Sequence, residues 1–249
     1  MKRKSIYYVG MDIHKKNISY CLLNGAKEVM REGTIPATRE ALLEWQKTLP
    51  KPWIGAMEAT LFTGWIYDFL KPFALEIKVV NPLRLKALTS AKKKNDRIDA
   101  RKIAEMLSVD LLPECYMAPV RIRELRRVLR HRTLLTHLAV MLKNKTAGIL
   151  MECGAEYNKS KLHGRRYFEN LLLRLEVPDS VLKILSMNRD ALTYLLKMQR
   201  DVIRQLKEAP EIRQRVENLM TIKGVGEVTA LTWALEIGEA QRFSSIRQA

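Results

Sequence analysis

The sequence predicts a mixed α/β domain followed by an all-α region. In roughly the first 118 residues, short apolar runs bounded by turn signals alternate with helical patterns. From Val120 onwards the strand signals vanish and long apolar stripes at helical spacing replace them. The first pattern is typical of a sheet covered by helices, and the second pattern is typical of long paired helices. We therefore expect three parts, at residues 1–118, 119–208 and 209–249.

A three-stranded meander is predicted at the N-terminus. Residues 6–11 form a short β-rich run that leads into Asp12, residues 18–23 a second strand and residues 27–35 a third. Asn24-Gly25, between the second and third runs, is a strong hairpin signal because both residues tolerate a positive φ.

The next elements alternate between helix and strand. Thr38 is a candidate N-cap, and the predicted elements are a helix at 39–49, a strand at 53–57 ending at Glu58, a helix at 63–70, a strand at 76–80 and a helix from about Asp96 to Leu107. A meander followed by this alternation indicates a mixed sheet of the RNase H-like (RuvC-like) type. In such a sheet the first and fourth strands are neighbours, and a late helix crosses their ends.

The second half of the chain is predicted to be helical. Residues 121–147 form one long helix with near-heptad spacing, residues 148–168 a connection with short helices, and residues 181–206 a second long helix capped by Asp179-Ser180. These helices fit an antiparallel pair or a dimerising coiled coil. A plain helical bundle fits equally well.

Four carboxylates are placed where this fold would gather them. Asp12 ends the first strand, Glu58 ends the fourth, and Asp96 and Asp99 begin a helix on one face. Each has an ordinary alternative, since acids at a helix start complement the helix dipole and Glu58 could be a solvated loop residue. His14 follows Asp12 by two residues and could assist the site, although a packed or surface histidine is the commoner case.

Converging carboxylates repel one another unless cations neutralise them. Mg²⁺ prefers carboxylate oxygens and water, and two such ions can clamp the attacking and leaving oxygens of a phosphodiester. We therefore predict a site for two Mg²⁺ ions, with Mn²⁺ able to substitute.

The charge balance favours a polyanionic partner. The chain has 44 Lys and Arg against 27 Asp and Glu, a formal net charge of +17, which favours nucleic acid over a membrane surface. The candidate nucleic-acid contacts are Lys92, Lys93, Lys94 and Arg97 beside the paired aspartates, Arg121, Arg123, Arg126, Arg127 and Arg130 on the first long helix, and Lys223, Gly224 and Gly226 in a turn that resembles a helix-hairpin-helix. Solvated surface is the alternative for each group.

Other sequence features narrow the class of protein. There is no apolar run of spanning length, and the three cysteines are far apart with no CxxC pair, so neither a zinc ribbon nor a disulfide framework is indicated. A reducing cytoplasm fits best, and the resemblance described next implies a nucleoid-associated protein of a prokaryote.

Several motifs together resemble one family. These are Tyr8-Val9-Gly10-Met11-Asp12-Ile13-His14-Lys15, Met57-Glu58-Ala59-Thr60, Val80-Asn81-Pro82, Lys94-Asn95-Asp96-Arg97-Ile98-Asp99-Ala100, Ile222-Lys223-Gly224-Val225-Gly226-Glu227-Val228-Thr229-Ala230 and Arg242-Phe243-Ser244-Ser245. They are similar to motifs of the DEDD transposases of insertion sequence family one hundred and ten, relatives of the Piv DNA invertases. The resemblance runs from about residue 6 to the last residue.

The resemblance implies a RuvC-like catalytic domain, a coiled-coil segment and the start of a C-terminal transposase domain. It implies a DNA recombinase that excises and inserts an element, acts as a dimer or tetramer and, in some members, is guided by a structured bridge RNA. On this sequence the metal-binding acids would be Asp12, Glu58, Asp96 and Asp99.

One part of the family pattern is not found in these 249 residues. The family supplies a serine nucleophile from its C-terminal domain, and Ser244 and Ser245 precede that position. We therefore expect a truncated chain that cannot complete strand exchange alone. Two other functions fit the same residues: a RuvC-like nuclease such as a junction resolvase, in which metals activate water, and a non-catalytic nucleic-acid-binding protein.

Overall fold

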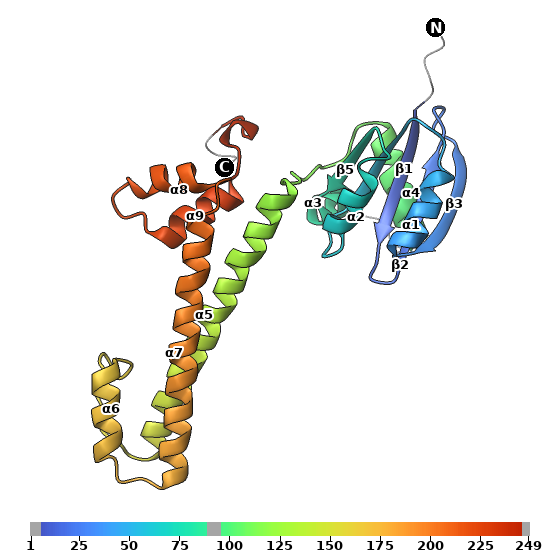
Figure 1. Cartoon of the computed structure of the whole chain (residues 1–249). Helices are drawn as coiled ribbons and strands as arrows, with labels where there is room; N and C mark the ends of the chain where they lie inside the picture. The colour runs from blue at the N-terminus through green and yellow to red at the C-terminus, as the bar shows by residue number, and fades with distance from the viewer. Residues whose placement is uncertain (1–5, 89–95, 246–249) are drawn as a thin grey trace. The chain divides into compact units, whose positions relative to one another are not determined.

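The computed structural model describes residues 6–88 and 96–245, and of residues 88 and 96–98 only the backbone. The chain divides into two compact units, residues 1–117 and 118–249, which we call the N-terminal unit and the helical unit (Figure 1). The finer division into three parts stays a prediction.

The N-terminal unit is built on a five-stranded sheet of order β3-β2-β1-β4-β5. Its strands are β1 (Tyr7–Ile13), β2 (Asn17–Leu23), β3 (Val29–Pro36), β4 (Trp53–Glu58) and β5 (Glu76–Val80). The first three pair antiparallel, whereas β1, β4 and β5 run parallel. This mixed sheet with helices confirms the predicted fold class.

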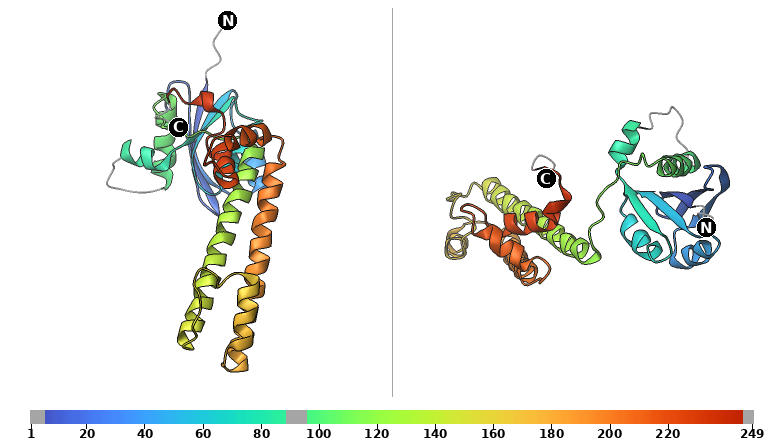
Figure 2. Two further views of the ribbon diagram at one scale, coloured as in Figure 1. Left: turned by 90° about the vertical axis from the view of Figure 1, so that its left-hand side faces the viewer. Right: turned by 90° about the horizontal axis from the view of Figure 1, so that it is seen from above.

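Helices cover both faces of the sheet (right view of Figure 2). On one face, α1 (Arg39–Lys47) and α2 (Thr63–Leu70) bury a core that includes Met11, Trp53 and Met57. On the other face lies α4 (Asp96–Ser108), whose Ala100 and Ala104 pack with Cys21 and Leu23. The predicted cap of α1 is present, since Thr38 Oγ1 accepts a hydrogen bond from the Ala41 amide at 3.2 Å.

Gly10 is where α4 approaches β1 most closely. A Cβ built on Gly10 would lie 2.1 Å from the Ala100 carbonyl oxygen and 2.4 Å from the Ala104 amide nitrogen. Glycine in a strand interior commonly marks such an approach by another backbone. Position 10 therefore sets how closely α4 sits over the sheet.

The helical unit consists of a long helical hairpin with shorter helices at both ends (Figure 1). Its elements are α5 (Val120–Glu152), α6 (Arg165–Arg174), α7 (Asp179–Lys207), α8 (Arg213–Met220), α9 (Glu227–Glu236) and the short 3-10 helix η1 (Ala240–Arg242). At one end α8 and α9 bury a cluster with Leu125 and Leu206 of the hairpin. At the other end α6 packs against Ile149, Leu150 and Leu185.

Three elements differ from the sequence-based prediction. The helix α3 (Pro82–Leu88) follows β5 where only a strand end was expected. Gly148, expected in the connection, lies inside α5. The second long helix begins at Asp179 with Pro178 at its N-cap, so Asp179 lies in the first turn instead of capping it by its side chain. Among the described residues, no helix is both long and apolar enough to cross a membrane.

Candidate metal centre

Asp12 and Glu58 occupy adjoining positions on neighbouring parallel strands. Met11 of β1 is in register with Met57 of β4, and each is followed by one of the two acids. Side chains alternate along a strand, so Asp12 shares the face of Gly10, which is the face that α4 covers. Glu58 shares that face with Ala56, which packs with Ile103 of α4. The fold therefore brings these two carboxylates to one edge of one face.

The start of α4 is directed toward the same edge. Ile103 and Leu107 of α4 pack in one cluster with Tyr8 and Ile54, near the beginnings of β1 and β4. The helix therefore runs antiparallel to β1, and its first turn lies toward the strand ends. Asp99 precedes the buried Ala100, and Asp96 is the first residue of the helix.

Asp12 is the most enclosed of the acids. The residue is 8% exposed, and its Oδ2 lies 3.1 Å from His14 Nε2. The His14 side chain is 52% exposed, so it covers the carboxylate from the solvent side. The sequence favoured a packed or surface histidine, and in the structure His14 is half-exposed and in contact with Asp12.

The structure leaves part of the predicted set undescribed. Lys92, Lys93 and Lys94 lie outside the described residues, as do the side chains of Asp96 and Arg97. Within residues 6–88 and 96–245, no three His, Cys, Asp or Glu side chains form a group that could hold a metal ion. The described part of the centre is thus the Asp12–Glu58 pair, with Asp99 on the adjacent helix.

Four of the predicted nucleic-acid-binding arginines have partners inside the helical unit. Arg126 donates to the Leu235 carbonyl at 2.7 Å and to the Glu236 carbonyl at 3.2 Å, which caps the end of α9. Arg121 pairs with Glu124 and Glu211, Arg123 donates to the Ala118 carbonyl, and Arg130 pairs with Glu236. These contacts explain their presence without any ligand.

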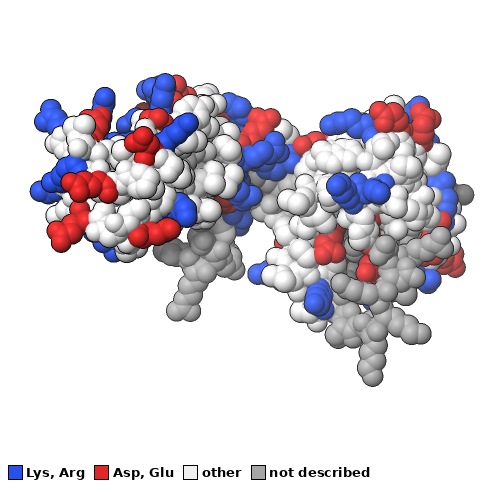
Figure 3. Space-filling model, turned by 90° about the horizontal axis from the view of Figure 1, so that it is seen from below, with Lys and Arg blue, Asp and Glu red and all other residues white. Residues whose placement is uncertain are grey.

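Arg127 differs from these four. Its side chain is exposed, and it has no ion pair or hydrogen bond with any part of the chain that the structure describes. On the face of the molecule drawn in Figure 3, Lys and Arg are interspersed with Asp and Glu on both units. On such a face, individual unpaired cations are the candidates for contact with a nucleic acid.

The turn before α9 leaves its backbone open. Gly224 has a φ of +90°, a conformation that favours glycine. Gly226 is the N-cap of α9, and a Cβ on either glycine would meet nothing within 4 Å. Lys223 is exposed beside them. The exposed glycines and Lys223 leave room for an anion at this helix start, as a helix-hairpin-helix turn requires.

Comparison with known proteins identifies the family. The sequence model of the IS110-type DEDD transposases, described as a transposase, matches residues 9–154, more than half of the chain. The chain belongs to this family. The match includes Asp12, Glu58, Asp96 and Asp99 and confirms the resemblance drawn from the motifs.

Insertion-sequence transposases are also similar to this chain over most of its length. The transposase for IS1328 of Yersinia enterocolitica is 22% identical over 247 residues, which are 98% of this chain and 71% of that protein. The transposase for IS1111A of Coxiella burnetii is 24% identical over 98% of this chain and 67% of its own length. The transposase for IS1533 of Leptospira borgpetersenii is 31% identical over 111 residues, 43% of this chain and 32% of that protein. As a member of this DEDD transposase family, the chain is a DNA-processing protein of a mobile element.

Proposed function

We propose that this transposase is a DNA recombinase of an insertion element and that its Mg²⁺-dependent site consists of Asp12, Glu58, Asp96 and Asp99. The observation that supports the proposal is the adjacency of Asp12 and Glu58 on β1 and β4, with α4 running over them. Two acids at adjoining strand positions repel each other, and a shared cation removes that cost.

The donor set fits magnesium in kind. All four residues offer carboxylate oxygens, which Mg²⁺ prefers over nitrogen or sulfur ligands. Asp12 is almost buried, and a buried carboxylate needs a compensating positive charge. When bound, Mg²⁺ would supply charge stabilisation to a phosphodiester undergoing substitution. Asp12 and Glu58 would hold it on the sheet, and the two aspartates of α4 would hold it from the helix.

The attacking group in this proposal is a serine of the C-terminal transposase domain other than Ser244 and Ser245. The family resemblance assigns that role to the C-terminal domain, and Ser244 and Ser245 precede the expected position. We further propose that a structured RNA guides the enzyme and that the enzyme acts as a homo-oligomer. Lys223 and the open glycine turn, together with Arg127, would contact phosphate groups.

Metal-dependent stabilisation tests the site directly. We expect Mg²⁺ or Mn²⁺ to raise the melting temperature of the purified chain, because a ligand at 100 times its Kd stabilises the folded state by about 2.7 kcal/mol. Asp12→Asn and Glu58→Gln should each abolish that shift. Glu76→Gln, an exposed acid at the opposite end of the parallel strands, is the matched control and should keep it. The same shift in all variants would refute the metal site.

The roles of serine and RNA need separate experiments. Sequencing the nucleic acid that copurifies with the protein should recover one structured RNA species, and random cellular RNA would contradict guidance. Incubation of residues 1–249 with DNA should give no covalent protein–DNA adduct. An adduct on Ser244 or Ser245 would contradict this assignment.

A further inference from the structure

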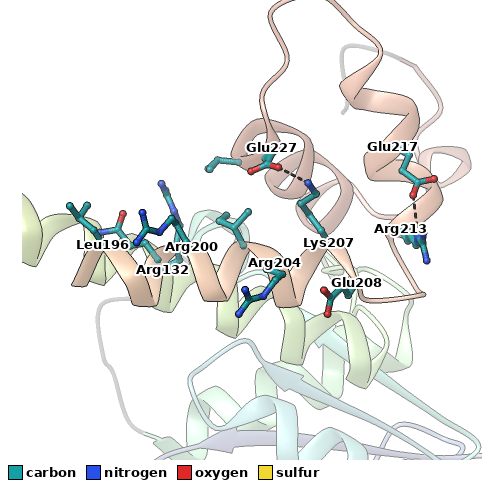
Figure 4. Close-up of a pocket in the computed structure, with 12 residues that line it drawn as sticks. Arg132, Leu196, Arg200, Arg204, Lys207, Glu208, Arg213, Glu217 and Glu227 are labelled. Atoms are coloured by element: carbon teal, nitrogen blue, oxygen red, sulfur yellow. Dashed lines mark hydrogen bonds and ion pairs between the residues drawn. The ribbon is translucent and has the colours of Figure 1, made fainter. Parts of the chain in front are cut away.

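A groove lies between the two long helices and the short helices at one end of the helical unit. Its volume is about 680 Å³, and its walls come from α5, α7, α8 and α9 (Figure 4). Five cations line it: Arg132, Arg200, Arg204, Lys207 and Arg213. We call it the α7 groove, because most of its lining residues belong to that helix. Of the five cations, only Arg132 belongs to the arginine-rich sequence of α5.

Three of the five cations are neutralised by nearby acids. Lys207 pairs with Glu227, and Arg213 Nε lies 3.0 Å from Glu217 Oε1, both pairs being drawn in Figure 4. Arg204 pairs with Asp201 at 2.7 Å. The Lys207–Glu227 pair joins α7 to α9, whereas the other two pairs lie within α8 and within α7. Together the three pairs leave that end of the groove close to neutral.

Arg132 and Arg200 have no such acid. Neither has a carboxylate partner among the residues that the structure describes, and the buried Nε of Arg132 has no hydrogen-bond acceptor. Gln199, next to Arg200, donates to the Leu135 carbonyl at 3.1 Å, which fixes α7 against α5 one turn from Arg132. The two guanidinium groups therefore enter the same groove from opposite helices. Two positive charges without a neutralising acid therefore line one groove, so the pair is suited to an anion.

We propose that the α7 groove binds the sugar-phosphate backbone of a nucleic acid through Arg132 and Arg200. The planar guanidinium group matches phosphate oxygens in a two-pronged contact. The net charge of +17 favours a polyanion over a single small anion. The inference rests on the proposed action on nucleic acid, but it adds a contact site on the helical unit that is separate from the carboxylates.

Salt-dependent binding of the full 249-residue chain tests the proposal. Binding is measured in EDTA, so that the acidic site contributes no metal, with a DNA duplex and an RNA hairpin of equal length as separate arms. The variant Arg132→Gln/Arg200→Gln removes two phosphate contacts. The slope of log K against log salt should therefore fall by about 1.8 for DNA, at about 0.9 per phosphate contact.

The matched control is Arg166→Gln/Lys183→Gln. It removes the same charge from exposed positions on α6 and near the start of α7, away from the groove, and should leave the slope unchanged. Arg200→Gln alone, on an exposed side chain, should lower the slope by about 0.9 even if the double variant fails to fold. Arg132→Lys/Arg200→Lys should retain most of the slope.

The arms also identify the ligand. Loss on both nucleic acids assigns the contact to the shared backbone, and loss on one assigns it to that nucleic acid. Equal loss in the control variant, no loss in Arg200→Gln, or competition only by an acidic peptide would overturn the proposal. Because no metal is present, failure here is distinguishable from failure of the metal-dependent stabilisation described above.

Discussion

Replacement of Gly10 by alanine should separate α4 from the sheet. The added Cβ would lie 2.1 Å from the Ala100 carbonyl oxygen, whereas real Cβ contacts essentially never fall below 3.0 Å. The added Cβ would clash with the backbone of α4, which cannot rotate away as a side chain could. The whole helix must therefore move by roughly 1 Å. Overpacking of this kind costs typically 1–3 kcal/mol, and rigid backbone on both sides points to about 3 kcal/mol.

Thermal unfolding followed by circular dichroism measures this cost. A loss of about 3 kcal/mol should lower the melting temperature of a unit this size by roughly 10 °C. Gly148→Ala is the control with the opposite sign. Gly148 lies inside α5 with open space around its Cβ position, so alanine should stabilise the helical unit by about 0.5–1 kcal/mol.

The same substitution should also weaken metal binding. Displacing α4 moves Asp99 away from Asp12 and Glu58, so Gly10→Ala should need more Mg²⁺ for the same stabilisation. An unchanged melting temperature and unchanged Mg²⁺ dependence would refute the close approach of α4 to β1.

Three further predictions concern other side chains. Arg126→Gln should destabilise the helical unit by about 2 kcal/mol in urea unfolding, because it loses charge-assisted hydrogen bonds to the end of α9. Arg127→Gln should leave unfolding unchanged and lower the slope of log K against log salt for DNA binding by about 0.9. Equal effects of the two substitutions would contradict this division. The ion pair with Lys78 lowers the pKa of Asp110. The pair therefore stabilises the fold at neutral pH, and this contribution is lost as the pH falls through the lowered pKa. Lys78→Met should flatten the acid side of a profile of melting temperature against pH, and an unaltered profile would contradict a stabilising role for the pair. The pKa of the Cys21 thiol is raised to about 12, mainly by burial. This thiol should therefore resist iodoacetamide at pH 8 until the protein unfolds. Rapid labelling of the folded protein would contradict the burial of Cys21.

Much of the N-terminal unit was predictable because its signals are local. The strand runs, the Thr38 cap and the order of elements each depend on a few neighbouring residues, and together they indicated the sheet and the edge at which Asp12 and Glu58 meet. The helix α3 was missed because no helix was expected between the strand at 76–80 and the helix that begins at about Asp96. Asn81 Oδ1 in fact accepts from the Leu83 and Arg84 amides, and proline is favoured at the first helical position.

The partners of the α5 arginines could not be predicted from the sequence. Their density in the sequence indicated a nucleic-acid surface, yet Arg126 and Arg130 have partners more than 100 residues away in the chain. Such pairing depends on how α9 folds back, which no local pattern reveals. Conversely, Arg200 drew no attention in the sequence, because its lack of an acid partner is visible only in three dimensions. The glycine at position 10, inside a strand, was a local signal of close backbone approach that could have been used.

The helical hairpin gives the helical unit the properties of a lever. With 33 residues, α5 is about 50 Å long at 1.5 Å per residue. Its two ends are anchored in separate apolar clusters, one with α8 and α9 and one with α6. A rotation of about 5° at the α8–α9 end would carry α6 through about 4 Å on an arm of this length. A small change at one end of the hairpin is thus magnified at the other.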